Sequence, residues 1–135
     1  MKTWKIGVAM AGAAGAALLG AQALRAQQPG FKRTELQKHD VGTPRGEVVQ
    51  ARADFEPGGA VPKHTHPGEE VSFVLEGSIE LDVDGKTQTI EAGKPFFIPP
   101  GVPHAAKNNG KGKAAVLSTY IIEKGKPLST MVAAK

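Results

Sequence analysis

The stretch KHTHPGEE, residues 63–70, holds two histidines and two glutamates in a chain that has only four histidines. His64 and His66 are two residues apart, so on an extended segment both side chains leave the same face and converge on one point. A Pro-Gly turn follows, after which Glu70 can face back toward the imidazoles, whereas Glu69 should point the other way. This spacing is typical of half a metal site. A polar loop rich in titratable side chains is the alternative interpretation.

The composition restricts which metal such a site could hold. The chain has no cysteine, which excludes disulfides and thiolate sites, so any metal ligands must be nitrogen and oxygen atoms. Two imidazoles and a carboxylate suit Fe, Mn, Ni, Co, Cu or Zn, whereas Ca and Mg prefer more oxygen ligands.

A second cluster, GKPFFIPPGVPH at residues 93–104, ends in His104. Three prolines and a glycine precede this histidine closely, and such a rigid turn can hold one imidazole still, as a further ligand requires. Taken alone, His104 is better explained as a loop histidine that caps a turn.

Together the two segments resemble the two signature motifs of the cupin family, with fifteen residues between them. The matching positions of the first motif are Gly58, His64, His66, Glu70 and Gly77. Those of the second are Gly93, Pro99, Gly101, His104 and Asn108. The resemblance covers residues 46–122. Within the family, the chain looks most like small single-domain cupins grouped with quercetin dioxygenase-like proteins.

The resemblance implies an all-β fold, a small antiparallel jelly-roll barrel that binds one divalent transition metal inside, either Fe, Mn, Ni or Zn. The ligands it implies are His64, His66, Glu70 and His104. It names no catalytic residue, because cupins include dioxygenases, isomerases, lyases, storage proteins and sensors.

Two functions follow as hypotheses. Three neutral histidines and one carboxylate leave a divalent metal with a formal charge of +1, which favours an anionic or enolate-forming ligand. The first hypothesis is an exported metalloenzyme of dioxygenase or oxidoreductase type that acts on a small enolic or anionic compound. The alternative is a non-catalytic cupin that binds a small molecule or a metal, because few acid-base residues accompany the ligands.

Few polar side chains on the predicted strands could support the ligands. The candidates are Arg52, Glu69, Ser72, Ser118 and Tyr120. Ser72 shares a strand face with Glu70 and is the best of them, although a hydroxyl satisfied by neighbouring backbone is the favoured interpretation. Asn108 is expected to turn the chain.

Short strands are the elements that the sequence predicts to hold these residues in place. A length of 135 residues suits one domain, and 17 glycines and 10 prolines favour strands joined by tight turns. Apolar residues alternate from Gly46 to Phe55, in EVSFVLEG and in SIELDVDGKTQTIE, where Asp84-Gly85 predicts a type I′ hairpin turn. FFIPP and AAVLSTYIIE supply further strands.

The N-terminus reads as a targeting segment. Lys2 and Lys5 precede an uncharged run rich in alanine and glycine, which predicts a signal peptide over residues 1–26, cleaved after Ala23 or Ala26. The alternative, an uncleaved membrane anchor, is less favoured because the run is weakly hydrophobic. We therefore expect a periplasmic or secreted protein with no stable membrane association.

Cleavage also changes the charge. It would leave 14 basic and 13 acidic side chains in place of 17 and 13, so the +4 of the whole chain is no sign of nucleic-acid binding. The expected partner is a small molecule.

The remaining segments are predicted to frame the barrel of residues 46–122. Residues 27–45 should form an extended arm in which His39 is solvated, and residues 123–135 a tail that packs along an edge. Because barrels often cover exposed edges by pairing, a homodimer that exchanges the arm or the tail is a further hypothesis.

Overall fold

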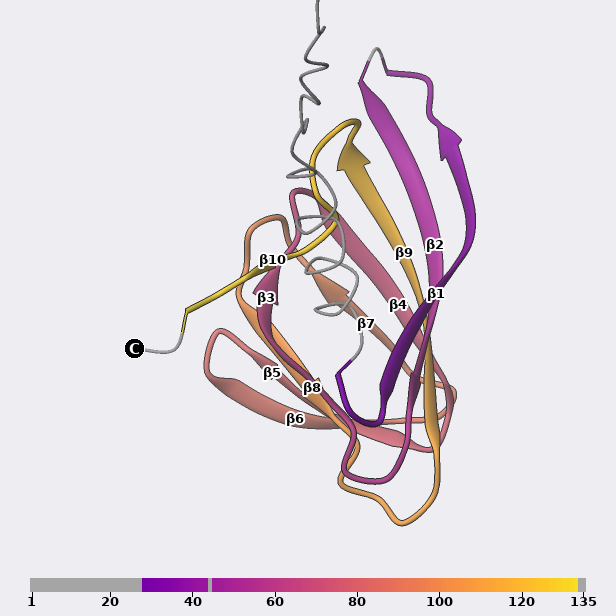
Figure 1. Ribbon diagram of the computed structural model, residues 1–135, viewed down its shortest axis with the longest axis vertical. Coiled ribbons are helices and arrows are strands. Elements are labelled where there is room, and N and C mark those ends of the chain that lie inside the picture. The colour runs from indigo at the N-terminus through magenta and orange to yellow at the C-terminus, as the bar shows by residue number, and fades with distance from the viewer. Residues whose placement is uncertain (1–27, 44, 134–135) are drawn as a thin grey trace, which may run out of the picture.

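The computed structural model describes residues 28–43 and 45–133, and these form ten strands and no helix (Figure 1). The strands are β1 (Phe31–Asp40), β2 (Gly46–Phe55), β3 (Ala60–Thr65), β4 (Glu69–Glu76), β5 (Ser78–Val83), β6 (Lys86–Glu91), β7 (Pro95–Ile98), β8 (His104–Lys107), β9 (Ala114–Glu123) and β10 (Thr130–Met131). The predicted signal peptide, residues 1–26, lies outside the described residues.

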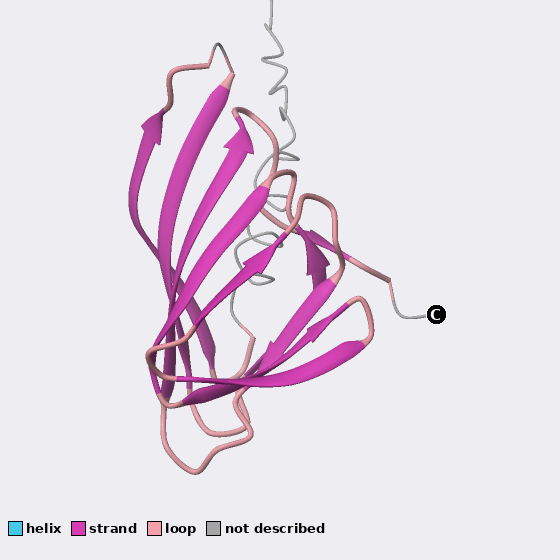
Figure 2. Ribbon diagram, turned by 180° about the vertical axis from the view of Figure 1, so that it is seen from behind, coloured by secondary structure: helices cyan, strands magenta, loops and turns pink. Residues whose placement is uncertain are grey.

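Two antiparallel five-stranded sheets face each other (Figure 2). The first has the order β1-β2-β9-β4-β7, and the second has the order β10-β3-β8-β5-β6. Because strands distant in sequence are neighbours in both sheets, the arrangement is that of a jelly roll. The predicted all-β jelly-roll fold is confirmed.

Strict alternation of side chains builds the interior. Along β2 every second residue is buried, including Val49, Ala51 and Phe55, while the residues between them are half-buried on the outer face. The inward residues form two hydrophobic clusters: one around Phe55 and Val74, the other around Val49 and Tyr120.

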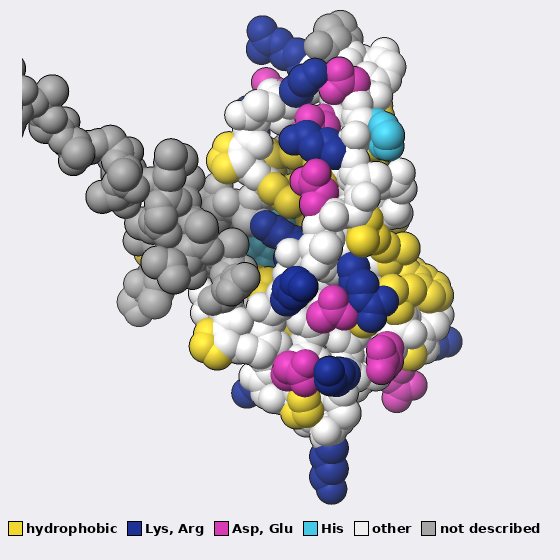
Figure 3. All heavy atoms as spheres, turned by 45° about the vertical axis from the view of Figure 1, so that its right-hand side comes forward, with side chains coloured by type: hydrophobic (Ala, Val, Ile, Leu, Met, Phe, Trp, Pro, Cys, Tyr) yellow, Lys and Arg dark blue, Asp and Glu magenta, His cyan; other side chains and the backbone are white. Residues whose placement is uncertain are grey.

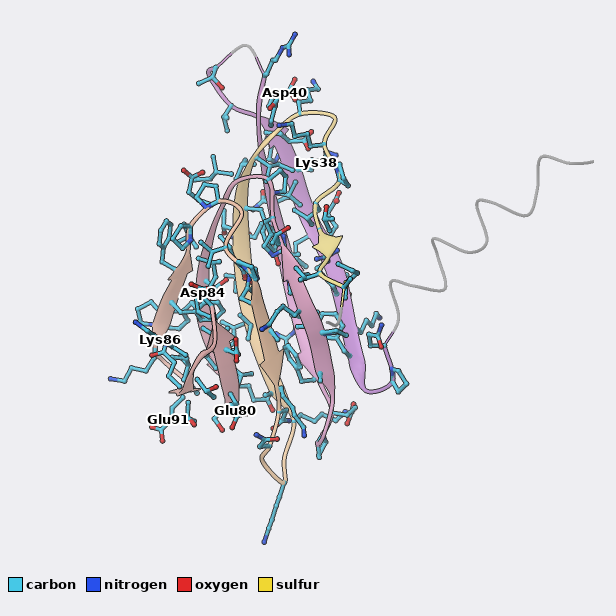
Figure 4. All side chains as sticks on the ribbon, turned by 90° about the vertical axis from the view of Figure 1, so that its left-hand side faces the viewer. Lys38, Asp40, Glu80, Asp84, Lys86 and Glu91 are labelled. Atoms are coloured by element: carbon cyan, nitrogen blue, oxygen red, sulfur yellow. The ribbon has the colours of Figure 1, made fainter. Side chains whose placement is uncertain are left out.

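The β5–β6 hairpin turns as the sequence predicts. Asp84 and Gly85 both have positive φ angles, of 51° and 82°, which is the requirement of a type I′ turn. Figure 4 shows Glu80, Lys86 and Glu91 on this hairpin directed away from the body of the molecule, and all three are exposed. Their charges therefore lie outside the barrel.

The outer face of the first sheet carries several large apolar side chains. Val71 and Phe73 on β4, Phe97 on β7 and Ile121 on β9 are between 43 and 55% exposed. Register places Val71 beside Phe97, and Glu69 beside Ile121. Figure 3 shows hydrophobic side chains gathered in a patch on the surface.

Both segments that were expected to frame the barrel contribute strands to it. Within the predicted arm, β1 pairs along its whole length with β2, through a register shift between Glu35 and Gln37. Within the predicted tail, β10 pairs with β3, where Met131 is opposite His64. The barrel strands therefore extend beyond 46–122, because residues 31–40 contain no glycine or proline that would interrupt a strand.

His104 and Asn108 flank a strand that the sequence did not reveal. His104 begins β8, which is only four residues long and lies between β3 and β5, so the interpretation of His104 as a turn-capping loop residue is wrong. Asn108 does turn the chain: its amide donates to the carbonyls of Phe55 and Gly112, and its oxygen accepts from the Gly110 N–H.

Candidate metal centre

Three histidines and one glutamate meet between the two sheets. His64 ends the inward face of β3, His66 follows that strand directly, His104 opens β8 and Glu70 lies on β4 of the opposite sheet. All four are buried, with 3 to 5% of each residue exposed. The structure thus brings together the four side chains that the sequence singled out.

Register and turns explain why they meet. His64 and His104 are direct partners in the β3–β8 ladder. The N–H of Gly101, within the proline-rich loop, donates to the carbonyl of His66 at 2.9 Å and so fixes that loop against the histidine segment. Gly68 lies so close to the carbonyl of Ile121 that a Cβ atom would clash with it. The turn between His66 and Glu70 therefore requires glycine.

Each histidine has one ring nitrogen beside a backbone carbonyl. The Nδ1 atoms of His64, His66 and His104 lie 2.7, 2.6 and 2.9 Å from the carbonyl oxygens of Pro62, Leu128 and Val102, respectively. A carbonyl can only accept, so Nδ1 carries the proton in each ring, and Nε2 of the neutral ring has a free lone pair.

These Nε2 lone pairs have no hydrogen-bond donor to face. The Nε2 atoms of His66 and His104 are buried without a hydrogen-bond partner among the described residues. They lie 3.1 and 3.2 Å from Oε2 of Glu70, an atom that is itself an acceptor. A divalent cation would satisfy all of these lone pairs at once, so the donor set fits a metal ion.

The ligand atoms are close enough for one ion. One donor atom from each of His64, His66 and His104 lies within 4.8 Å of the others, and the ring centroids are 4.3 to 4.9 Å apart. Imidazole nitrogens with one carboxylate oxygen suit Fe, Mn, Ni, Co or Zn. The three histidines form a candidate metal-binding site.

Burial keeps the site ready for a cation. It lowers the pKa of His64 to about 4, so this ring is neutral near pH 7 and its lone pair is available. Burial alone would raise the pKa of Glu70. In the metal-free protein, hydrogen bonds from His104 and His66 when they carry a proton on Nε2, and from Ser72, outweigh burial, so the pKa lies well below its usual range. Glu70 is therefore a carboxylate.

Two serine hydroxyls hold Glu70 in place. Ser72 and Ser118 both contact its Oε1, at 2.7 and 2.9 Å, and contact each other at 2.8 Å. Oε1 is thus occupied, while Oε2 faces the histidines. The preference for a backbone-bound Ser72 hydroxyl is wrong, because the side chain reaches the neighbouring carboxylate.

The other predicted supporting residues divide between the two faces of the sheet. Tyr120 is 4% exposed, and its ring centroid lies 4.7 Å from that of His66. Burial raises the pKa of Tyr120 far above its usual value, so the phenol keeps its proton. Arg52 and Glu69 are half-buried and lie on strand positions that alternate with the inward ones. His39, as expected, is exposed.

A small cavity of about 40 Å³ opens beside the ligands. Its walls include Phe55, Ile79, Leu81 and Phe96, with His64, Glu70 and His104 at one part of the lining. By volume it holds about three water-sized groups. The site therefore lies beside a small, mostly apolar cavity that is partly open to solvent.

Sequence reasoning missed three residues beside the site. Arg33 of β1 lines the cavity and donates from its guanidinium to the hydroxyl of Ser129 at 2.8 Å. Ser129 and Leu128, which accepts from His66, precede β10. The unbroken run from Phe31 to Asp40 was the available signal for β1, whereas no local pattern marks Leu128 or Ser129.

Comparison with known proteins identifies the family. Residues 51–120 match the family described as "Cupin domain". The chain belongs to the cupin family. Among the described residues, no helix is long and apolar enough to span a membrane.

Curated relatives of this cupin include plant proteins. Germin-like protein subfamily 2 member 2 of Arabidopsis thaliana is 47% identical over 79 residues, which cover 54% of this chain and 36% of the relative. Nectarin-1 of Nicotiana plumbaginifolia is 46% identical over 81 residues, covering 54% of this chain and 34% of the relative. The matched part of the cupin spans about a third of the length of these relatives.

Solved structures show the same fold. A structure of oxalate oxidase aligns with a TM-score of 0.63 at 30% identity, covering 79% of this chain and 57% of that one. An RmlC-like cupin from Shewanella frigidimarina aligns with a TM-score of 0.57 at 28% identity, covering 71% and 79%. The cupin resemblance is confirmed, and the similarity found points to germin-like proteins. The narrower grouping with quercetin dioxygenase-like proteins stays a prediction.

Proposed function

We propose that this cupin is a mononuclear metal-dependent oxidoreductase that acts on a small anionic compound. The observation that carries the proposal is the convergence of three buried histidines and Oε2 of Glu70 beside a small cavity. In this proposal His64, His66, His104 and Glu70 are the four ligands of the ion.

The charge of the site favours an anion. Three neutral imidazoles and one carboxylate would leave a divalent ion at a formal charge of +1. When bound, the metal would supply a Lewis-acidic centre with redox chemistry if it is Fe or Mn. The chain itself would exclude bulk water with its apolar walls and hold the substrate anion beside the ligands.

A small organic acid is the substrate class that agrees with the cavity. The cavity beside the ligands is small and mostly apolar, which favours a compact anion. Oxalate oxidase, one of the similar structures, was also solved with the substrate analogue glycolate. These similarities support a short carboxylate.

The proposed reaction uses dioxygen as the oxidant. Oxidation of a dicarboxylate such as oxalate breaks its carbon–carbon bond, releases carbon dioxide and gives up two electrons. Dioxygen takes up these electrons with two protons and becomes hydrogen peroxide, so atoms and charge balance. Tyr120 keeps its proton under these conditions, which leaves solvent as the proton source.

Elemental analysis of the protein from its native compartment, followed by a peroxide assay with oxalate and glycolate, tests the proposal. We expect Fe or Mn at about one ion per chain, and peroxide formation that Glu70→Ala abolishes. Zinc with no peroxide would contradict the oxidoreductase and favour the non-catalytic binding module.

We also propose export and self-association. Export rests on the signal-like residues 1–26, and recovery of the functional protein in the cytoplasmic fraction would contradict it. A homodimer would cover the apolar side chains of β4, β7 and β9, which are too exposed for an isolated surface. Light scattering should give twice the chain mass, and Phe97→Asp should give the mass of one chain.

A further inference from the structure

Arg33 is a half-buried cation that lines the same cavity as the metal ligands. Its guanidinium donates to the hydroxyl of Ser129 at 2.8 Å, and that hydroxyl also lies 3.5 Å from Nδ1 of His66. Ser129 therefore touches both the arginine and a histidine of the site. Arg33 also lies close enough to Tyr120 to affect the pKa of its phenol.

The charge of Arg33 is not balanced by a carboxylate. Of the described arginines, Arg45 lies within 4 Å of Glu123, and Arg52 within 4 Å of Asp54 and Glu76, but no described carboxylate lies that close to Arg33.

Segments outside the described residues supply no acidic side chain. Residues 1–27, residue 44 and residues 134–135 contain no aspartate or glutamate. A half-buried guanidinium without an acidic neighbour is costly unless an anion from solution pairs with it.

The cavity itself offers no acid that could neutralise Arg33. Glu70 is the one acidic residue in the lining, and Ser72 and Ser118 contact its Oε1 while its Oε2 faces the histidines. With a divalent ion bound, the chamber would contain two separate positive centres, the metal and Arg33, within mostly apolar walls.

We infer that Arg33 recognises the second carboxylate of a short dicarboxylate whose first carboxylate lies at the metal. Arg33 is then a specificity-determining residue, because its planar guanidinium can form two parallel hydrogen bonds with a carboxylate. The small size of the cavity favours a short ligand. This inference rests on the proposed metal site and substrate class. It adds that Arg33 makes the protein bind dianions more tightly than monoanions.

Ser129 positions the guanidinium. Its hydroxyl accepts one N–H of Arg33, and the fork has further donors that can reach an anion. Because β10 fixes the next two residues against β3, Ser129 has a defined place beside the cavity.

Calorimetric titration of the Mn(II)-loaded full chain tests the inference with oxalate and malonate as dianions and glycolate as monoanion. We expect Arg33→Gln to weaken oxalate and malonate binding by about tenfold or more, and glycolate binding by less than about twofold. Arg33→Lys keeps the charge without the planar fork, so its affinity for oxalate and malonate should lie between those of the unsubstituted protein and Arg33→Gln. Ser129→Ala should also lose affinity for these dianions, by a smaller factor.

Arg52→Gln is the matched control, because it removes a paired arginine from the outer face of the adjacent strand. It should bind both dianions as the unsubstituted protein does. Equal manganese content in all variants would show that each has kept its metal site. Unchanged dianion binding by Arg33→Gln and Arg33→Lys, or no dianion binding by the unsubstituted protein, would overturn the inference.

The readout is separate from turnover. Dianion binding that depends on Arg33 without peroxide formation would support the inference and sink the proposed oxidase activity. Peroxide formation from oxalate with dianion affinity unchanged in Arg33→Gln would do the reverse.

Discussion

His64 and His104 are direct partners across β3 and β8, with ring centroids 4.3 Å apart, although forty residues separate them in sequence. A single register thus fixes two of the proposed ligands. Slipping this pairing by one residue would turn one ring out of the interior. The metal site is therefore as well defined as the ladder that carries it.

Glu70→Gln should weaken metal binding strongly while the fold persists. The amide keeps the shape of the carboxylate but removes the negative charge that faces His66 and His104. We expect the affinity for Mn(II) to fall by at least about a hundredfold in competition with a chelating dye.

The neighbouring Glu69→Gln supplies the control, because Glu69 alternates with Glu70 along β4 and does not share its inward face. It should leave the affinity unchanged. Equal losses of Mn(II) affinity in the two variants would mean that Glu70 acts only through its negative charge and does not bind the metal directly. The metal-free Glu70→Gln protein should unfold at a lower denaturant concentration, because the depressed pKa of Glu70 means that its ionised form stabilises the fold.

Removing the two hydroxyls beside Glu70 should loosen the carboxylate. In the double variant Ser72→Ala and Ser118→Ala, Oε1 loses both contacts, so the carboxylate can rotate away from the histidines. The affinity for Mn(II) should drop by about tenfold, as is usual for residues that orient a ligand. Thr119→Ala, on the outer-facing neighbour of Ser118, should have no such effect, and a drop of similar size there would contradict the argument.

Truncation after Lys126 should damage the metal site more than the fold. The cut removes the Leu128 carbonyl that accepts from Nδ1 of His66, so this ring can change its tautomer or orientation. We expect metal affinity to fall by about tenfold or more while the far-ultraviolet spectrum stays that of a β protein.

Truncation after Val132 is the matched control, since it keeps Leu128, Ser129 and β10. It should bind metal as the full chain does. If both truncations bind metal equally well, the Leu128 carbonyl does not orient His66.

The metal-free protein should lose stability between pH 6.5 and pH 4. His64 has a pKa of about 4 in the folded chain against 6.5 when unfolded, so the unfolded state binds more protons in this window. The free energy of unfolding should therefore fall by about 2 kcal/mol between pH 6.5 and pH 5. The contribution of Glu70 has the same sign, but it is lost only below the unfolded value of 4.5.

Urea titrations in the presence of a chelator measure this slope. His64→Asn should flatten it, whereas His39→Asn, at an exposed position of β1, should leave it unchanged. A slope that persists in His64→Asn would assign the proton uptake to other groups.

The sequence predicts the parts of this fold in which pattern and chemistry are local. Alternation in residues 46–55 placed β2 correctly, and Asp84-Gly85 predicted the β5–β6 hairpin turn because type I′ geometry depends on those two residues. The same-face argument for His64 and His66 succeeded for the same reason, since two-residue spacing on an extended chain fixes direction.

The parts that escaped prediction depend on distant partners. β8 is four residues long, too short for a periodic signal, and is defined by pairing with β3 and β5. β1 is mostly polar because residues 34–40 are exposed on both faces, so its residues resemble a linker. Arg33 could not be assigned to the site without knowing that β1 lies beside β2.

The contact between Leu128 and His66 joins residues 62 positions apart, and Arg33 enters the same chamber from the first described strand. A stretch shorter than residues 33–128 would therefore lack part of the centre. While the polypeptide is still being synthesised, or is threaded unfolded through a membrane channel, the histidine nitrogens do not lie close together and cannot bind one ion. Under the proposed export, the ion would be chosen from those present where folding is completed, and the destination compartment would decide which metal the protein holds.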